Sequence, residues 1–427
     1  LLASASSSSS SWHQPAAMSM LQLCPRSALV FLVLSSVVLA HVVEASAAPR
    51  STNTSTSFVG LNKDDDLVIN SPAGHAVLIN GVDLQQQNSA LRSELAELKS
   101  FVNDKLFNVC MALGTLSISC TQSVYGAGSS VAQMSPDYIA FSVDDGTNIT
   151  VLDSVSLSAI YKFSGHTRQV FALEISASQS LLASGSPNNN NGGSGEVMVW
   201  NLTTGEIAAS FVAHTFVIRQ LRFSQDEKRL YSASDDKLIN LYDLTTGVLV
   251  RSVNNGKYIH ALAVSRNSDY IVVGGDQCTL DVWDFDVTVR LKSWSAHCAD
   301  VQTINFSFDG AFLITGGDDK YVKLWNAKDA SSLGPPAAHT FLATTADNVI
   351  QARPLFSNLL FVSDYHTFRI SDFHGNPVFT WPVPADLRSS ASMVVSRTKD
   401  NSTRFAFTGL RANQPKYDGF VCRLGCA

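Results

Sequence analysis

The sequence predicts an all-β fold built from repeated units, and three observations lead to this fold class. Predicted strand ends that carry an aromatic residue followed by Asn or Asp recur at Trp200, Tyr242, Trp283 and Trp325, at a nearly constant spacing. Each unit repeats a small-residue strand, a tight turn and an alternating strand in the same order. Repetition at about 40 to 45 residues is typical of a β-propeller, in which each unit is one four-stranded blade.

Three weaker units flank these four, so that seven units are counted. The sequence therefore predicts a seven-bladed β-propeller over residues 114–427. The final unit ends after its third strand. Leu116–Thr121, just before the first unit, is placed to supply a fourth strand, which would leave no open edge. The strand pairs of the weaker units are Asp137–Val143 with Ile149–Asp153, Leu359–Asp364 with Phe368–Asp372, and Phe405–Leu410 with Phe420–Leu424.

The repeats resemble the WD-repeat β-propeller family. The resemblance rests on Gly-His or Ala-His pairs at unit starts, which end at His166, His214 and His297, and on the equal separation of His214 from Tyr242 and of His297 from Trp325. In that family a loop His, a turn Asp, a strand Ser or Thr and the terminal aromatic residue form a hydrogen-bonded structural tetrad. The resemblance implies such tetrads, in place of catalytic triads, at His214, Ser232, Asp236 and Tyr242 and at His297, Thr315, Asp319 and Trp325.

Two units depart from that pattern. His166 faces a loop, Pro187–Gly195, that has replaced its turn Asp, and this insertion places His166 farther from Trp200 than His214 is from Tyr242. The unit that ends at Trp283 has Tyr258–His260 where a Gly-His pair would stand. We therefore expect Trp200 and Trp283 to mark blade ends whose tetrads are incomplete.

Residues 1–47 are interpreted as upstream translation followed by a secretory signal. No methionine precedes Met18, Arg26 supplies a positive charge, Ala28–Val43 is an apolar core, and Ala45–Ala47 forms a small-residue cleavage site. The apolar run is shorter than the roughly 20 residues of a spanning helix. We expect cleavage and a secreted chain without a membrane segment; an uncleaved signal anchor is the alternative.

Six cysteines remain beyond the signal, an even number that suits disulfides in an extracellular protein. If Leu116–Thr121 lies beside the last strand, Cys120 and Cys422 become cross-strand neighbours, and Cys110 could then meet Cys426. The local alternative pairs Cys110 with Cys120 and Cys422 with Cys426. Neither connectivity follows from the sequence alone.

The family resemblance also places Cys278 and Cys298 on one face of the propeller, which makes their pairing plausible. N-glycosylation sequons begin at Asn53, Asn148, Asn201 and Asn401, and we expect glycosylation there. A fifth sequon at Asn305 falls inside a predicted strand.

Residues 48–66 are a Ser/Thr-rich linker, and residues 67–109 are predicted to form a short β segment and a helical stalk. Two strands, Leu67–Ile69 and Ala76–Ile79, are expected around the turn Ser71–Gly74. Heptad spacing then runs over residues 84–109, with alternate core positions at Leu84, Leu91 and Leu98 and at Asn88, Leu95, Val102 and Val109. The narrow apolar stripe favours a homo-oligomeric coiled coil, and packing of a single helix on the globular domain is the alternative.

Charge and motif content predict no catalytic, cofactor or metal site. The chain has 30 Lys+Arg against 36 Asp+Glu and no long basic run, which argues against nucleic acid or an anionic membrane as the main partner. Asp64–Asp66 lacks the alternating ligand order of a calcium loop. No CxxC, HExxH, GxSxG or glycine-rich phosphate loop occurs.

These observations predict a secreted, non-enzymatic interaction or structural scaffold. Its propeller loops would bind other proteins or extracellular glycans, and an oligomeric stalk would raise avidity, as in an extracellular matrix, a surface coat or a filamentous appendage. The alternatives are a secreted propeller enzyme of the hydrolase or dehydrogenase type, which needs convergent polar groups at the central channel, and a signal-anchored receptor.

Overall fold

The computed structural model describes four short segments, 58–61, 67–70, 78–79 and 82–83, and most of residues 116–426. The gaps in the latter are 144–145, 188–194, 268, 335–344, 346, 350, 357–358, 365, 383–386, 401 and 412–416. The predicted signal, most of the linker, the helix over residues 84–109, Cys110 and the sequon residues Asn53 and Asn401 lie outside the described residues. The chain divides into two compact units, residues 1–92 and 93–427.

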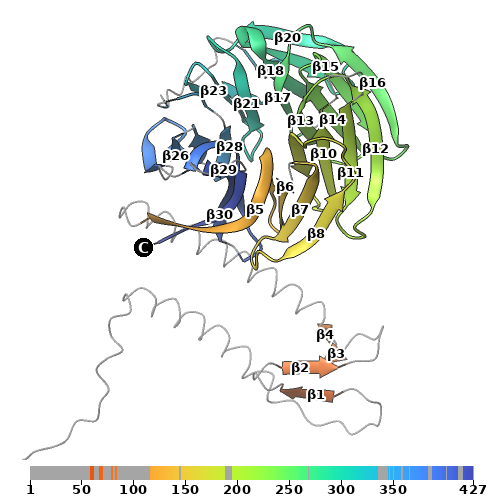
Figure 1. Cartoon of the computed structure of the whole chain (residues 1–427), viewed down its shortest axis with the longest axis vertical. Helices are drawn as coiled ribbons and strands as arrows, with labels where there is room; N and C mark the ends of the chain where they lie inside the picture. Colours follow the sequence, from red (N-terminus) through yellow and green to blue (C-terminus); the bar gives the residue numbers. More distant parts are fainter. Residues whose placement is uncertain are drawn as a thin grey trace, which may run out of the picture. The chain divides into compact units, whose positions relative to one another are not determined.

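The described residues of the second unit form a seven-bladed β-propeller, whose blades follow one another in chain order around a ring (Figure 1). The first strand of each blade contacts the first strand of the next, which defines the wall of a central channel. Blade 1 contains the end of β5 (Leu116–Met134), β6 (Tyr138–Val143), β7 (Asn148–Asp153) and β8 (Ala159–Ser164). Blade 2 contains β9 (Ala172–Ile175), β10 (Leu181–Ser186), β11 (Gly195–Asn201) and β12 (Ile207–His214).

The next three blades continue this arrangement. Blade 3 contains β13 (Ile218–Phe223), β14 (Arg229–Ser234), β15 (Leu238–Asp243) and β16 (Val248–Asn254). Blade 4 contains β17 (Ile259–Val264), β18 (Tyr270–Gly275), the short 3₁₀ turn η1 (Asp276–Cys278), β19 (Thr279–Asp284) and β20 (Arg290–Ser295). Blade 5 has three described strands, β21 (Val301–Phe306), β22 (Phe312–Gly317) and β23 (Val322–Asn326).

The last two blades include the strands predicted from the weaker sequence units. Blade 6 contains β24 (Gln351–Phe356), β25 (Leu359–Ser363), β26 (Thr367–Asp372) and β27 (Pro377–Pro382). Blade 7 contains β28 (Leu387–Arg397), β29 (Thr403–Arg411), β30 (Tyr417–Cys426) and the beginning of β5.

Strand β5 closes the ring because it belongs to two blades. Its beginning pairs antiparallel with β30, and its end pairs with β6 (Figure 1). Cys120 lies opposite Cys422 in this register, and the two are joined by a disulfide across 302 residues of sequence. This bond excludes the local alternative for both cysteines. The pairing of Cys110 with Cys426 stays a prediction because Cys110 lies outside the described residues.

The second and third strands of each blade are short and apolar because neighbouring blades cover both of their faces. All six residues of β18 are buried, as are five of six in β14. Gly275 at the end of β18 allows an especially close approach, since a Cβ there would lie 2.1 Å from the backbone oxygen of Tyr258. The outermost strands are exposed instead, with six of seven β16 residues open to solvent.

Two separate hairpins precede the propeller. Strand β1 (Phe58–Leu61) pairs with β2 (Leu67–Asn70), and β3 (Leu78–Ile79) pairs with β4 (Val82–Asp83). Strands were thus correctly expected near residues 67–70 and 78–79, but the hairpin around Ser71–Gly74 was wrong, because each strand pairs with a partner on its other side. The two residues between β3 and β4 are Asn80-Gly81, a strong hairpin signal that was overlooked in the sequence.

Candidate functional site

The four side chains predicted as a tetrad in blade 5 lie in one hydrogen-bonded chain. Trp325 Nε1 donates to Thr315 Oγ1 at 2.9 Å, and the Thr315 hydroxyl lies 2.8 Å from His297 Nε2. His297 Nδ1 is 2.8 Å from Asp319 Oδ1. The indole can only donate and the carboxylate can only accept, so the chain runs from a donor at Trp325, through the Thr315 hydroxyl and the His297 ring, to an acceptor at Asp319.

Blade 3 repeats this arrangement with a tyrosine. His214 contacts Asp236 through Nδ1 at 2.8 Å and Ser232 through Nε2 at 2.6 Å, and the Ser232 hydroxyl is 3.2 Å from that of Tyr242. Asn240, which sequence reasoning missed, adds an amide 3.0 Å from His214 Nε2. Asn240 stands two residues before the closing aromatic residue and therefore on the same face of its strand, a spacing that could have identified it.

Both tetrads lie inside the propeller. The side chains of His214 and His297 have 0% exposure and those of Asp236 and Asp319 have 3% and 5%. Burial raises the pKa of each aspartate, but the hydrogen bond from its histidine, together with backbone amide donors, outweighs burial and holds the pKa below its ordinary value. Side chains this enclosed satisfy one another and fix the turn, which is a structural role.

In blade 2 a different carboxylate stands at the place of the missing aspartate. His166 Nε2 is 2.7 Å from Ser184 Oγ, to which Trp200 Nε1 donates at 2.8 Å, so three members keep their places. Glu196, on β11, approaches His166 Nδ1 only to 3.5 Å. Burial lowers the pKa of His166 despite this carboxylate. Glu196 was missed because it follows the unusually long loop rather than a tight turn.

Blade 4 replaces the tetrad with another polar network. Trp283 Nε1 donates to Asn255 Oδ1 at 3.0 Å, and Asn255 Nδ2 donates to Asp281 Oδ2 at 3.2 Å. Lys257 Nζ lies 3.5 Å from the same carboxylate oxygen. Asp281, like Asn240, stands two residues before the closing aromatic residue, so the network fills the same internal position with different chemistry.

The predicted disulfide between Cys278 and Cys298 is wrong, because the structure holds both as free thiols. Their backbones are fixed by other contacts. Cys278 has a left-handed φ of 65° in η1 and its carbonyl accepts from the His297 amide at 3.1 Å, while the Cys298 amide donates to Asp319 at 2.9 Å. Burial and the nearby charge of Asp300 raise the pKa of Cys278.

Three sequon residues fall in the described part of the propeller. Asn148 begins β7 and Asn201 ends β11, and both are half-buried. Asn201 Oδ1 accepts from the Thr203 amide at 2.7 Å, which holds the side chain in its turn. Asn305 lies within β21 and its amide donates to the carbonyl oxygen of Ala352 in the next blade at 2.9 Å, so that amide points into the protein.

One face of the propeller carries the loops that begin with His166, His214 and His297 and the tight turns at Asp235-Asp236 and Asp318-Asp319; we call it the tetrad face. Arg219 makes a two-pronged ion pair with Asp235, through Nε at 3.0 Å and Nη2 at 2.7 Å. His260 lies 3.7 Å from the same carboxylate. Phe216 and Tyr258 on neighbouring loops are 57% and 46% exposed.

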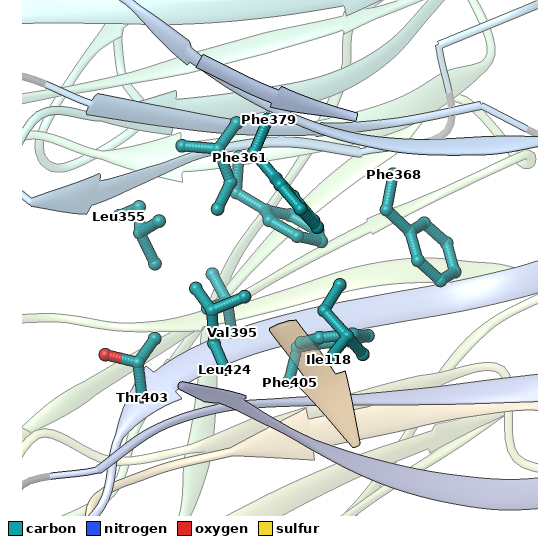
Figure 2. A pocket seen from close by; sticks show the side chains of 10 residues that line it. Ile118, Leu355, Phe361, Phe368, Phe379, Val395, Thr403, Phe405 and Leu424 are labelled. Atoms are coloured by element: carbon teal, nitrogen blue, oxygen red, sulfur yellow. The ribbon is translucent and has the colours of Figure 1, made fainter. Parts of the chain in front are cut away.

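The described residues surround cavities of two kinds. A small apolar one of about 10 Å³ lies between blades 6 and 7, where Phe361 and Phe379 face Val395 and Leu424 (Figure 2). It has room for about one water molecule and is a packing void. Two larger cavities, of about 260 and 330 Å³, lie at the ends of the first strands away from the tetrad face.

Among the described residues, no group of three or more His, Cys, Asp or Glu side chains is arranged to hold a metal ion. In the same part of the chain, no helix has the length and apolar character that a membrane crossing needs.

Four segments of the chain match the family model "WD domain, G-beta repeat", at residues 157–201, 205–243, 247–284 and 288–326. Each segment runs from the outermost strand of one blade to the third strand of the next, from β8 to β11 in the first case and from β20 to β23 in the last. A sequence repeat therefore bridges two blades.

Curated relatives share this region at low identity. The chain is 24% identical over 198 residues to "WD repeat-containing protein SL1-17" of Schistosoma mansoni, covering 46% of this chain and 64% of that protein. It is 26% identical over 188 residues to "B-type cell cycle switch protein ccs52B" of Medicago truncatula, covering 43% and 37%. The match to "Apoptotic protease-activating factor 1" of Rattus norvegicus is 25% over 199 residues and covers 46% and 15%. The matched region thus spans less than two thirds of each of these relatives. Over these four segments the chain is therefore similar to WD-repeat proteins, and the seven-bladed fold agrees with that similarity.

Proposed function

We propose that this protein is a secreted, non-enzymatic scaffold that binds other proteins through the tetrad face of its propeller. WD-repeat propellers are suited to protein interaction and are generally non-catalytic. In this proposal the protein is located outside the cytosol, in a matrix, surface coat or appendage. Residues 84–109 form an oligomer that brings several propellers together. Extracellular glycans are a second class of ligand that the loops could take.

The observation that carries the binding proposal is the pair of half-exposed aromatic side chains on the tetrad face. Phe216 and Tyr258 come from consecutive blades, and Lys237 Nζ stands 5.1 Å from the centre of the Tyr258 ring. The ion pair of Arg219 with Asp235 lies on the same face. Exposed aromatic residues bordered by arginine and other charges are the composition of binding hot spots in protein interfaces.

Two observations support secretion. The Cys120–Cys422 disulfide joins the ends of the propeller, and structural disulfides persist mainly in oxidising compartments. The apolar run Ala28–Val43, followed by small residues, has the pattern of a cleaved signal. Expression from Met18 in a secreting eukaryotic cell line tests this directly. We expect protein in the medium that begins at Ala48 and shifts in mobility after glycosidase treatment; retention in the cells would contradict secretion.

Light scattering tests the stalk. The mature chain, Ala48–Ala427, is compared with a version that lacks residues 84–109. We expect a two- or threefold mass that falls to one copy on deletion, because the heptad spacing lies in that segment. A single copy in both cases would contradict the oligomeric scaffold.

Affinity capture tests the tetrad face. Immobilised mature protein is incubated with extracellular extract of the producing tissue, beside the variant Phe216→Ala/Tyr258→Ala. Leu249→Ala/Val250→Ala serves as the matched control, because these residues are 42% and 51% exposed on the outermost strand β16. We expect retained proteins to be lost only with the first variant. Loss with both variants, or with neither, would contradict binding through the tetrad face, and retention on a glycan array in place of protein would favour the glycan ligand.

A further inference from the structure

Polar side chains from the first strands of three consecutive blades meet at one carboxylate. Glu174 on β9 accepts from Gln133 Nε2 on β5 at 2.5 Å and from Arg222 Nη1 on β13 at 2.8 Å, both at Oε2. The side chains of Arg222 and Glu174 keep 13% and 16% exposure. Both side chains line the cavity of about 260 Å³ at the ends of the first strands, so this residual exposure is towards that cavity.

A fourth side chain reaches the same place from the far side of the ring. Arg353 on β24 in blade 6 has Nη1 3.5 Å from Gln133 Oε1, and its Nε donates to Gln351 Oε1 at 3.1 Å. The positive charge of Arg353 lowers the pKa of Glu174, and the positive charge of Arg222 lowers the pKa of Arg353. In a ring of seven, blades 2 and 3 are the farthest from blade 6, so side chains that interact across this distance meet within the central channel.

The charges in this channel cluster, Gln133, Glu174, Arg222 and Arg353, do not balance. Two guanidinium groups face one carboxylate, which leaves one positive charge in excess among the described side chains. Burial, followed by repulsion from Arg222, lowers the pKa of Arg353 to about 10, so it stays protonated at neutral pH. Burial raises the pKa of Glu174, although the charges of Arg222 and Arg353 act to lower it. An enclosed excess charge is costly unless a counter-charge joins it.

The channel also provides space beside these groups. The cavity of about 260 Å³ adjoins two members of the cluster, Glu174 and Arg222, and is also lined by Arg266 and Asn305, whereas Gln133 and Arg353 do not line it. A water molecule takes about 30 Å³ in the liquid, so the cavity has the volume of several waters. Arg266 adds a further positive charge at its rim, and its Nε donates to the Ser307 carbonyl at 3.2 Å.

We propose that the central channel binds a small oxyanion of the phosphate or carboxylate class between Arg222 and Arg353. A guanidinium presents parallel N–H donors that match two oxygens of such an anion. Arg222 and Arg353, on opposite walls, hold the anion from two sides, and Glu174 limits affinity by repelling it. This site lies inside the propeller, so it is independent of the tetrad face and of protein binding there.

Anion-dependent melting of the full chain tests the proposal. The Tm is measured with increasing sodium phosphate and, separately, with sodium succinate, each against sodium chloride of equal ionic strength. A ligand that binds only the folded state raises the Tm in proportion to the logarithm of its concentration. We expect such a rise with phosphate, with succinate or with both, and titration calorimetry then gives the Kd. No rise beyond chloride with either anion would overturn the proposal.

Charge variants separate a specific site from general ionic effects. We expect Arg222→Gln and Arg353→Gln each to weaken anion binding about tenfold or more, since each removes a charged hydrogen-bond donor. Glu174→Gln removes the repelling carboxylate and is expected to tighten binding by a similar factor. Arg229→Gln is the matched control, because Arg229 pairs with the exposed Asp286 on the surface and should bind as wild type does.

The variants are expected to change anion affinity in opposite directions, which keeps the test decisive if one of them folds poorly. A folding defect weakens binding and cannot produce the gain expected for Glu174→Gln. If Arg222→Gln does not fold, Arg353→Gln and Glu174→Gln decide by the same comparison. Equal loss in Arg229→Gln, or no gain in Glu174→Gln, would overturn the channel site.

Discussion

Cys120 on β5 is bonded to Cys422 on β30, two residues that are 302 positions apart in the sequence and directly opposite each other in the closing strand pair. The bond crosses the joint where the last blade receives its fourth strand from the beginning of the propeller. The cross-link therefore secures the one place where the ring depends on a distant segment of the chain.

Removal of this disulfide should cost stability. We expect Cys120→Ser/Cys422→Ser to lower the free energy of unfolding by about 2–5 kcal/mol, because the bond restricts the unfolded chain over a long loop. Denaturant unfolding with and without a reductant measures it. Reductant should lower the stability of wild type to that of the variant and leave the variant unchanged. Cys298→Ser is the control, since Cys298 is a free, exposed thiol; equal stability of wild type and the double variant would contradict the prediction.

The two kinds of histidine–carboxylate contact should differ in strength. Asp319→Asn removes a carboxylate 2.8 Å from the His297 ring, and we expect a loss of about 2–3 kcal/mol. Glu196→Gln acts on a contact of 3.5 Å, at which a hydrogen bond is weak, and should cost about 1 kcal/mol or less. Chemical denaturation of both variants checks the order. A larger loss for Glu196→Gln would show that the long contact is the stronger one.

Stability should fall in acid because of Asp236 and Asp319. Both have a pKa below the ordinary value in the folded protein, so the unfolded chain takes up a proton first as the pH falls. Their contribution is fully present above about pH 4, the unfolded value, and is lost as the pH falls through the lower folded value. Unfolding free energies from pH 7 to 2 measure the slope. Asp236→Asn/Asp319→Asn should flatten this slope, and an unchanged slope would assign acid sensitivity to other groups.

Phe368 should be a major contributor to the interface between blades 6 and 7. Its side chain is 1% exposed and its ring lies 5.1 Å from that of Trp381 and 5.6 Å from that of Phe405 across the interface. We expect Phe368→Ala to cost about 3–5 kcal/mol, because it enlarges the apolar void drawn in Figure 2. Phe308→Ala is the control, since Phe308 is 53% exposed and should change stability by about 0.5 kcal/mol or less. Similar losses for both would contradict the packing argument.

The blade architecture could be predicted because its signals are local and repeated. Trp200, Tyr242, Trp283 and Trp325 are each the last residue but one of the third strand of a blade and recur at nearly constant spacing, so the period is visible without any knowledge of contacts. The missing fourth strand of the last unit followed from counting strands. The hairpin at Asn80-Gly81 was equally local and was overlooked.

Other contacts could not be predicted, because they join residues that are far apart in the sequence and meet only in the folded protein. Glu196 on β11 reaches His166 although no tight turn precedes it. Asn255 contacts Trp283 from 28 residues earlier, the spacing that separates His214 from Tyr242, so the repeat period did mark this position and it was overlooked. The channel cluster joins Gln133 to Arg353 across 220 residues and several blades. No periodic pattern marks the channel residues, because each blade contributes a different side chain and only ring closure brings Gln133 and Arg353 together.

Strand β5 also determines how the propeller would respond to mechanical load. Tension applied through the chain that precedes Leu116 enters the ring at the beginning of β5, and Cys120 lies only four residues further along. The covalent link to Cys422 takes that tension before it reaches the β30 partners of Gln122 and Val124. The pairing of β5 with β30 beyond Cys120 cannot be separated from this end without breaking the disulfide. An oxidised propeller that is held by the chain preceding Leu116 can therefore transmit force while its blades stay paired.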